Sequence, residues 1–570
     1  MKIPPITNSG LDLRDYQHRL KADIFQAWRN GAKDVCAVSA TGSGKTRTSG
    51  SVVHEFSNAG IPAMIAAHRQ ELVGQLSCAM AAEGVYHNII ASKATIRLVS
   101  NMHVSRFGRS YFHPEAPAIV SSVDTLIRRD VSSFADKIGL YVTDEAHHLL
   151  VSNKWGKCRS LFPNALGLGV TATPDRSDGG GLGRHADGFF DVLVQGPPMR
   201  DLIRQGYLTD YRIFCPPPSI DLSNIAVTAS GDYSRDQLKT ASAKSTIVGD
   251  VIGHYKRIAM GKRGVTFVVS VEDAENTAEA FNAAGVPAKV LTGLNTDAER
   301  AEVIGQLERG EILQIVAVDI ISEGFDLPAI EAISFARPTQ SYSLYIQMFG
   351  RALRPSPGKQ TALILDHVGN VERFIAKGRG LPDTPQKWSL DRRERGARNA
   401  QPDDVMTLTT CLAEGCYAAY DNSLSACPWC GASPEPSEGG RGGPEQVSGE
   451  LYEMDPGLMA QLRGEADRIL APDYPEQVRL DMLAKHAPSV GVHTAVKRAG
   501  MQQAAQSELR GRMARWMSVW ERAGLPVADV RGMFKQVFGV DYLTAQTLPA
   551  KGAEELAGRL DASLREYGAQ

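Results

Sequence analysis

Apolar and polar positions alternate in blocks along the first 200 residues. Short apolar runs, typical of buried strands, are separated by stretches in which apolar residues recur every three to four positions, typical of helices facing a core. Alternating strands and helices of this length predict a parallel sheet with helices on both faces. The predicted strands lie at 34–38, 62–67, 118–121, 141–143 and 166–171, and the predicted helices at 13–28, 46–56 and 71–82.

The same alternation begins again near residue 264, after proline-rich segments at 196–198 and 215–218. It predicts a second α/β domain with a sheet of its own. Two similar sheets in one chain suggest a ligand cleft between them. The second set of predicted strands lies at 264–270, 288–292, 312–319, 333–336 and 361–366, and its helices lie at 272–284, 297–308 and 341–353.

The pattern changes beyond residue 369. A stretch rich in Lys and Arg at 377–398 is interpreted equally well as a solvated connector or as an arm that contacts phosphates. A flexible linker follows by composition, and apolar residues then recur at helical spacing to the end of the chain. We predict six parts: a first lobe at 1–200, a connection at 201–260, a second lobe with the basic connector at 261–400, a cysteine module at 405–435, a linker at 436–450 and a helical domain at 451–570.

Composition indicates the class of protein but does not indicate what the protein binds. The chain has 570 residues, 43% of them hydrophobic and 22% charged, as in soluble globular proteins. No apolar run approaches the roughly 20 residues that span a bilayer, and the first ten residues hold no apolar signal region, so we expect a cytoplasmic protein without a membrane partner. The formal net charge of -2 does not discriminate, because basic strips are diluted in a long chain.

The stretch SATGSGKT, from Ser39 to Thr46, predicts a phosphate-binding loop. Gly42 and Gly44 allow backbone N–H groups to turn toward an anion at the start of a helix. Lys45 is then expected to reach the β and γ phosphates of a nucleotide, and the Thr46 hydroxyl to ligate Mg²⁺. The general pattern has glycine where this chain has Ser39.

An acidic pair ends one of the predicted strands of the first sheet. Asp144 and Glu145 follow the run at 141–143, and open α/β sheets bind ligands at such strand ends. Asp144 is expected to hold Mg²⁺, and Glu145 to polarise the water that attacks the γ phosphate. Taken alone, the pair could equally be solvated or cap a helix.

Four of the eight cysteines cluster with the spacing C-x₄-C-x₁₀-C-x₂-C. Two close pairs of thiolates predict a tetrahedral Zn²⁺ site in a module of about 25 residues that has too little core to fold alone. An iron–sulfur cluster and free thiols remain alternatives. The predicted ligands are Cys411, Cys416, Cys427 and Cys430.

Several motifs occur in a fixed order, namely GSGKT, DEAH and TATP in the first lobe, then SEGFDLP and QMFGRALR in the second. This set resembles the superfamily 2 nucleic-acid helicases of the DEAH type and covers residues 13 to about 370. The stretches TATPDRSDGGGLG, GRALRPSPGKQ and LDHVGN are similar to the RadD-like DNA repair helicases and their phage-encoded relatives. The resemblance implies two RecA-like parallel-sheet lobes that form an ATP cleft.

The resemblance also implies roles for individual residues. In the ATP site, it assigns the adenine edge to Gln17, and ribose and strand contacts to the loop of Glu323, Gly324 and Asp326. The implied nucleotide-binding residues are Gln17, Thr41, Gly42, Ser43, Gly44, Lys45, Thr46, Gly324 and Asp326. The implied catalytic residues are Lys45, Asp144, Glu145, His147, Gln347, Arg351 and Arg354.

Gln347, Arg351 and Arg354 are spaced to share one face of the helix predicted at 341–353. The two arginines are expected to neutralise charge on the transferred phosphoryl group. The resemblance further implies that Thr171 and Thr173 couple the ATP state to the grip on a strand. The implied contacts to the nucleic-acid backbone are His68, Arg69 and Thr125.

The resulting hypothesis is an ATP-dependent DNA helicase or translocase that uses Mg²⁺ and carries Zn²⁺. The expected partners are single-stranded or forked DNA and other replication or repair proteins, in a bacterial or phage-infected host cell. An RNA helicase, an ATP-switched binding or remodelling factor and the motor part of a restriction system are the alternatives. No nuclease-like constellation of carboxylates and lysine was recognised in the sequence.

Overall fold

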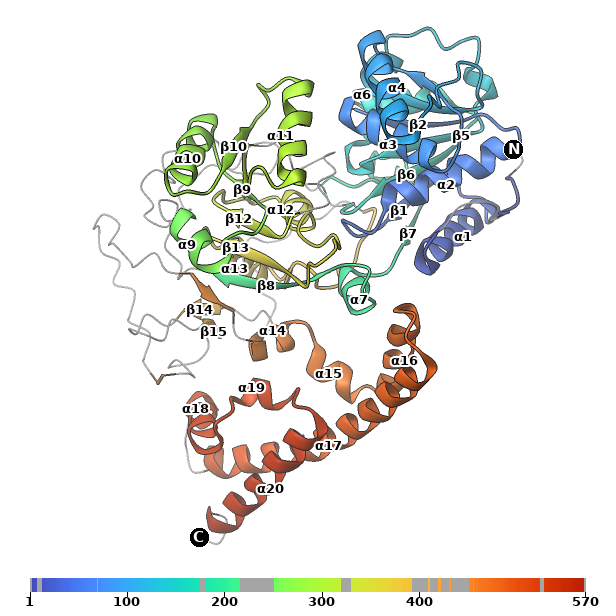
Figure 1. The fold of residues 1–570 in the computed structure, drawn as a ribbon. Helices are drawn as coiled ribbons and strands as arrows, with labels where there is room; N and C mark the ends of the chain where they lie inside the picture. The colour runs from blue at the N-terminus through green and yellow to red at the C-terminus, as the bar shows by residue number, and fades with distance from the viewer. Residues whose placement is uncertain are drawn as a thin grey trace.

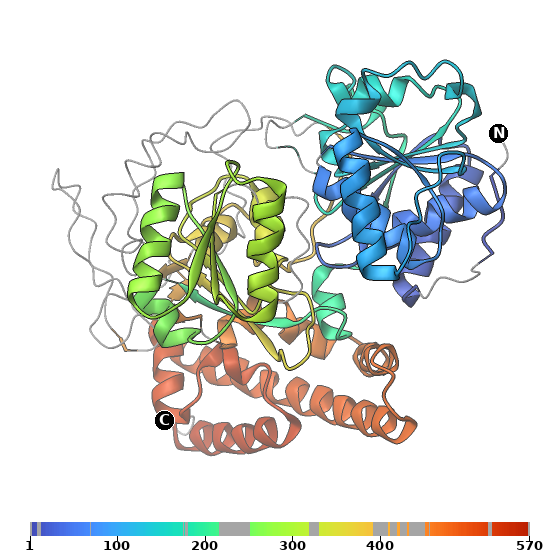
Figure 2. The same ribbon diagram turned by 45° about the horizontal axis from the view of Figure 1, so that its top comes forward.

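Two α/β lobes lie side by side, and a group of helices from the end of the chain lies against them (Figure 1; Figure 2). Each lobe is built around a seven-stranded sheet. The computed structural model describes residues 3–7, 13–68, 70–174, 176, 180–215, 251–318, 330–391, 408–410, 419–421, 430–431, 451–454, 456–522 and 527–567.

Lobe 1 is a fully parallel sheet with the strand order β3-β4-β2-β5-β6-β1-β7. Its strands are β1 Asp34–Val38, β2 Ala63–Ala67, β3 Asn88–Ile90, β4 Ala118–Ser122, β5 Leu140–Asp144, β6 Leu166–Thr171 and β7 Val192–Gln195. Its helices are α1 Asp15–Arg29, α2 Lys45–Asn58, α3 Gln70–Ala82, α4 Lys93–Phe107, α5 Val123–Leu126 and α6 Lys154–Ser160.

Burial on both faces explains the apolar strands of lobe 1. Every residue of β1, β2, β4, β5 and β6 is buried, as expected for a parallel sheet covered by helices on each side. Helices α1 to α4 pack on one face, and α5 and α6 pack on the other. The carboxyl ends of these strands are therefore the exposed edge at which ligands can bind.

Lobe 2 has the strand order β10-β11-β9-β12-β13-β8-β16, parallel except for the last strand. Its strands are β8 Asp210–Cys215, β9 Gly264–Phe267, β10 Ala288–Leu291, β11 Gln314–Ala317, β12 Ala332–Phe335, β13 Thr361–Asp366 and β16 Tyr452–Glu453. Its helices are α7 Met199–Arg204, α9 Val251–Ile258, α10 Val271–Ala283, α11 Asp297–Arg309, α12 Tyr342–Phe349 and α13 Asn370–Ala376. Helices α9 and α10 pack on one face, and α7, α11, α12 and α13 pack on the other.

Two crossings between the lobes lie within the described residues. The first crossing runs from β7 to α7, whose Met199 already packs in the core of lobe 2. The second begins near Leu381, which is buried in lobe 2, and ends at Leu390, which is buried in lobe 1. The Leu390 carbonyl accepts hydrogen bonds from the N–H groups of Leu182 and Gly183, at 3.0 and 2.9 Å.

The last part of the described chain is helical. Its elements are α14 Pro456–Leu462, α15 Glu465–Leu470, α16 Tyr474–Ala484, α17 Ser489–Arg522, α18 Val527–Phe538, α19 Tyr542–Ala545 and α20 Ala550–Tyr567. Trp516 and Trp520 lie one turn apart on α17, with ring centroids 5.9 Å apart, and Trp516 is buried among α17, α18 and α20. A short pair of strands, β14 Leu408–Thr410 and β15 Ala419–Asp421, precedes this part.

These helices are fixed to lobe 2 by a strand and by charge. Strand β16 pairs with β8 at the edge of the sheet. Arg463, between α14 and α15, lies 3.0 Å from Asp210 and 3.6 Å from Asp383, and Arg200 lies 3.1 Å from each of the same two carboxylates. Within this network the Asp383 side chain is fully buried, whereas the Asp210 side chain is about half exposed.

The prediction of two parallel-sheet lobes is confirmed, with differences in detail. Strand β8 lies within the segment 201–260, which was predicted as a connection, yet it belongs to the sheet of lobe 2. The helix predicted at 341–353 ends at Phe349, and the chain continues as a turn. The backbone of Gly350 packs directly against lobe 1 at that point, so the geometry of the cleft decides where the helix ends.

Candidate active site

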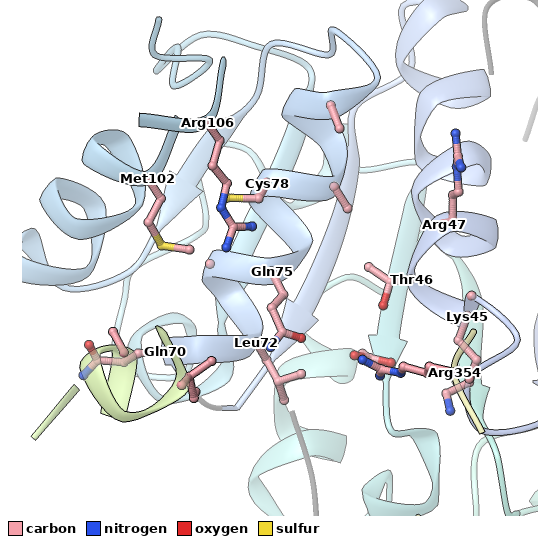
Figure 3. Close-up of a pocket in the computed structure, with 18 of the residues that line it drawn as sticks. Lys45, Thr46, Arg47, Gln70, Leu72, Gln75, Cys78, Met102, Arg106 and Arg354 are labelled. Atoms are coloured by element: carbon pink, nitrogen blue, oxygen red, sulfur yellow. The ribbon is translucent and has the colours of Figure 1, made fainter. Parts of the chain in front are cut away.

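A cavity of about 850 Å³ opens between the two lobes (Figure 3). Lys45 and Thr46 lie at one end of it in this view beside Arg354 from lobe 2, whereas Cys78, Met102 and Arg106 lie at the other end. The structure thus brings together predicted residues that lie some 300 positions apart. Those that line the cavity are Thr41, Gly42, Gly44, Lys45, Thr46, Asp144, Glu145, Gln347, Arg351 and Arg354.

The loop after β1 has the backbone form that a phosphate cradle requires. Gly42 and Gly44 have φ of +82° and +85°, in the left-handed region that favours glycine, and Gly44 is the N-cap of α2. A Cβ atom on Gly44 would lie 2.6 Å from the Gln17 side-chain nitrogen. The loop therefore presents the N-terminus of α2, with its unpaired N–H groups and positive dipole end, to the cavity.

Ser39 takes part in the loop as a hydrogen-bonding group. Its hydroxyl lies 2.7 Å from the Ser43 hydroxyl, and both side chains are buried. The Ser43 N–H also donates to the Ala40 carbonyl at 3.1 Å. The residue that departs from the general glycine pattern thus ties the start of the loop to its middle.

Two neighbouring side chains of α1 support the same loop. The Tyr16 hydroxyl donates to the Ser43 carbonyl at 2.6 Å, and burial raises the pKa of Tyr16, so the group stays a donor. The Gln17 amide nitrogen donates to the Ser43 carbonyl at 3.0 Å, while its oxygen accepts from the Arg14 N–H at 3.0 Å. The adenine contact of Gln17 stays a prediction; its place here is against the loop backbone.

The acidic pair lies at the carboxyl end of β5, facing the cavity. Asp144 accepts a hydrogen bond from the Glu145 N–H at 3.1 Å, and both residues are buried. Glu145 has φ +51° and ψ +56°, a left-handed conformation that is rare for residues other than glycine and common at functional sites. Its carboxylate Oε2 lies 3.5 Å from His147 Nδ1.

Hydroxyl groups link this pair to lobe 2. His147 Nδ1 lies 3.2 Å from the Thr171 hydroxyl, which donates to the Thr173 carbonyl at 3.1 Å and accepts from the Thr173 N–H at 3.2 Å. The Thr173 hydroxyl then lies 2.5 Å from the hydroxyl of Ser343 on α12. A continuous chain of polar contacts thus runs from the acidic pair to the other lobe.

The turn after α12 brings lobe 2 to the loop of lobe 1. Gln347 and Arg351 are buried, although only Gln347 lies in the helix and both predicted arginines lie in the following turn. A Cβ atom on Gly350 would lie 2.4 Å from Thr41 Cγ2. The expectation that the three residues share one helix face is therefore wrong, but all three do line the same cavity.

Known protein families match both lobes. Residues 10–176 match the family described as "Type III restriction enzyme, res subunit", and residues 243–356 match the family described as "Helicase conserved C-terminal domain". The two matches fall on the two lobes in turn, and the second of them is a helicase family.

Several relatives are similar to these helicase lobes. A 51.5 kDa protein of a Lactococcus phage is 32% identical over 295 residues, which are 51% of this chain and 61% of that protein. The putative ATP-dependent helicase IRC3 of Saccharomyces cerevisiae is 25% identical over 373 residues, 63% of this chain and 51% of that protein. The chain thus spans about half to three fifths of the length of these relatives.

Among solved structures, the fragment of a putative HsdR subunit of a type I restriction enzyme from Vibrio vulnificus covers 65% of this chain and 65% of its own. The two are 17% identical, with a TM-score of 0.47.

Two of the residues expected to contact nucleic acid are described, and both lie on lobe 1. His68 follows β2, and its ring contacts those of His148 and Trp155 edge-on, with centroids 5.6 and 5.3 Å away. Thr125 lies in α5 and is half-buried. Arg69 and the loop of Glu323, Gly324 and Asp326 lie outside the described residues, so their roles stay predictions.

The predicted zinc ligands are almost all outside the described residues. Cys430 is exposed, whereas Cys411, Cys416 and Cys427 are not described. Across the described ranges, no group of three or more His, Cys, Asp or Glu side chains is placed to hold a metal ion. Nor does any helix in those ranges have the length and apolar character needed to cross a bilayer.

Proposed function

We propose that this protein is an ATP-dependent DNA helicase or translocase of the DEAH type, related to the RadD-like DNA repair helicases. The observation that carries the proposal is the two-sided cleft. Lys45, Thr46, Asp144 and Glu145 come from one lobe, and the arginine turn comes from the other. Hydrolysis then depends on closure of the two lobes, since neither lobe holds a complete set of groups.

Each group has a task that its position supports. Lys45 binds the β and γ phosphates at the start of α2, and Thr46 with Asp144 holds the Mg²⁺ ion. Glu145 orients the attacking water and takes its proton. Arg351 and Arg354 neutralise the charge that develops on the transferred phosphoryl group, an effect worth roughly 10³ to 10⁵ in rate in related hydrolases.

Buried polar atoms without a hydrogen-bond partner support a polar ligand in this cleft. Thr41 Oγ1 and Gln347 Nε2 are buried and have no hydrogen-bond partner among the described residues. Buried polar groups are normally satisfied, so two such atoms from the two lobes around one cavity fit a site built for a phosphate ester and water. Mg²⁺-bound ATP supplies the electrophilic phosphorus and the charge that these residues recognise.

Coupling to movement follows from the contact between Thr173 and Ser343. Since this contact joins lobe 1 to α12 of lobe 2, opening of the cleft breaks it and closure restores it. Alternation between the two states changes the grip on a strand that lies across both lobes. DNA is preferred to RNA as the strand because of the motifs shared with the RadD-like and phage helicases.

The test is an ATPase and unwinding assay with matched variants. Wild type, Lys45→Ala and the exposed lysine control Lys157→Ala are assayed with single-stranded, duplex and forked DNA and with RNA. We expect DNA-stimulated hydrolysis and fork displacement by wild type and Lys157→Ala, and loss of hydrolysis in Lys45→Ala. Full activity of Lys45→Ala would contradict the site.

The same assay separates the alternatives. Stimulation of ATP hydrolysis by RNA and not by DNA would favour an RNA helicase. Stimulation by DNA without strand displacement or movement would favour an ATP-switched binding factor. Movement on duplex DNA without fork displacement would favour a translocase of the kind that restriction systems use.

We also propose a zinc module at residues 405–435, on the basis of the cysteine spacing. Elemental analysis of protein purified without chelators is expected to give one zinc per chain. The variant Cys427→Ser should lose the metal, whereas Cys215→Ser, at a cysteine outside the cluster, should keep it. Iron in place of zinc, or no metal, would contradict the proposal.

A further inference from the structure

The turn that carries the two arginines leaves backbone carbonyls to be satisfied. Helix α12 ends at Phe349, and a helix end exposes carbonyl groups that find no partner within the helix. Lys359 Nζ donates to the carbonyls of Ala352 and Arg354, the second at 2.8 Å. The Leu353 carbonyl between them accepts from the Thr209 N–H at 2.7 Å. Hydrogen bonds to three successive backbone carbonyls, at residues 352 to 354, thus fix the conformation of the turn.

The same ammonium group reaches a third segment. Lys359 Nζ donates to the Ile330 carbonyl at 2.7 Å, two residues before β12. Its three donors therefore all have carbonyl acceptors, which is the full capacity of a lysine ammonium group. Lys359 connects the arginine turn to the base of the central sheet of lobe 2 through one point charge.

Lys359 is half-buried. Partial removal from water lowers its pKa to about 8, with Glu331 opposing this shift and Arg354 acting in the same direction. Its three carbonyl acceptors match the three donors of an ammonium group, which a neutral side chain does not supply. The role is a local one, because all three of its acceptors lie within lobe 2.

The position of the turn decides where the guanidinium groups lie. Gly350 packs against Thr41, and a Cβ atom on Gly42 would lie 3.7 Å from Arg354 Cγ. The arginine turn and the phosphate loop are therefore in direct contact. A shift of the turn would move both arginines relative to Lys45 and Thr46.

We propose that Lys359 is a positioning residue for ATP hydrolysis, whose ammonium group fixes the turn of Arg351 and Arg354 against the phosphate loop. This inference rests on the proposed function, because it gives the arginines their task. It adds a residue that touches none of the reacting atoms and acts through the backbone of those that do.

The experiment compares Lys359→Met, Lys359→Arg and the control Lys262→Met. Lys262 also forms an ion pair beside Ile330, 3.0 Å from Glu331, but does not contact the turn. We expect Lys359→Met to lower the single-turnover rate of ATP cleavage by about 10- to 100-fold, since a misplacement of about 1 Å costs on the order of 10² in rate. The dissociation constant of Mg-ATP should change by less than about threefold, because the phosphate loop of lobe 1 is intact.

Two further measurements separate positioning from a loss of structure. Lys359→Arg, which keeps the charge and donors, should recover most of the rate. On an Arg351→Ala, Arg354→Ala background, Lys359→Met should have no further effect, because the residue acts through those arginines. If Lys359→Met unfolds by circular dichroism, Lys359→Gln, which keeps two donors, is used in its place.

The outcomes distinguish this inference from the proposed function. Normal cleavage by Lys359→Met, with a defect in Arg351→Ala, would overturn the positioning role and leave the ATP site intact. Losses that multiply on the arginine-free background would overturn it as well. A normal rate of ATP cleavage in the Arg351→Ala, Arg354→Ala variant would show that the two arginines have no role in hydrolysis. The proposed role of Lys359 would then be contradicted as well.

Discussion

Gly350→Ala isolates the contact on which closure of the cleft depends. Gly350 has φ −63° and ψ −14°, a helical conformation that alanine adopts without backbone strain. Its Cβ atom, however, would lie 2.4 Å from Thr41 Cγ2 and 2.5 Å from Thr41 Cβ. Carbon atoms pack at about 3.5 to 4.0 Å, so the turn and the loop must separate by about 1 Å.

The variant should therefore keep the fold of each lobe but be much less active. A separation of about 1 Å between reacting groups costs on the order of 10² in rate, so we expect kcat for ATP hydrolysis to fall by about 10- to 100-fold. ATP binding to the phosphate loop should remain within about threefold of wild type. Stability is followed by thermal unfolding, and hydrolysis by phosphate release with saturating single-stranded DNA.

Gly511→Ala is the matched control. Gly511 is exposed on the helix α17, and nothing lies within 4 Å of a Cβ atom placed there. This change adds the same methyl group without a steric clash, so kcat should be unchanged. If Gly350→Ala hydrolysed ATP at the wild-type rate, the close approach of Gly350 to Thr41 would not be part of the active state, and the reasoning from the two-sided cleft would fail.

Three other predictions concern the polar groups of the site. Glu145→Gln should lower kcat by about 10²- to 10⁴-fold while nucleotide binding is kept, as measured by single-turnover cleavage and fluorescent nucleotide titration; equal losses in binding would contradict the role of a base. In a double-mutant cycle, Thr173→Val and Ser343→Ala should show a coupling free energy of about 0.5–1.5 kcal/mol, which is about 2- to 13-fold in the DNA-stimulated rate of ATP hydrolysis. Additive effects of the two substitutions would argue against coupling between the lobes. The pKa of Lys359 is about 8 in the fold and 10.5 in a free side chain, so the unfolded chain binds more protons between these pH values. Wild type should therefore gain stability relative to Lys359→Met as pH rises from 8 to 10.5. Thermal unfolding at several pH values measures this gain.

The parts of the site that follow a local pattern could be predicted from the sequence. Gly42, Gly44, Lys45 and Thr46 lie within one short loop, and the order strand, loop, helix is itself the signal. The acidic pair at Asp144 could be predicted for the same reason, because it directly follows a buried strand. In each case the functional residues are neighbours in the sequence.

Residues that act across the fold had no such signal. Tyr16 and Ser343 are single residues of common types, and each contacts a segment elsewhere in the chain, 27 and 170 positions away. The contacts of Lys359 with Ala352 and Arg354 are only seven and five positions away, but they depend on how the chain turns after Gly350. No sequence pattern marks contacts of either kind.

Of the elements that were missed or misjudged, two have a physical reason that the structure shows. Helix α4 was not predicted from the sequence. Its buried face is formed by Thr95, Val99 and His103, and two of these three residues are polar, so apolar residues do not recur along it at helical spacing. The helix predicted at 341–353 was too long, because apolar residues continue past Gly350 at helical spacing. There, contact with the other lobe overrides the local preference of the chain.

The two described crossings between the lobes have a consequence for the closure that we propose. Gln195 to Met199 in the first crossing and Pro382 to Trp388 in the second line one small cavity, so the two segments lie near each other. Both segments contain prolines, which restrict their backbone. Opening and closing of the cleft must therefore bend the chain at this one place in the described residues.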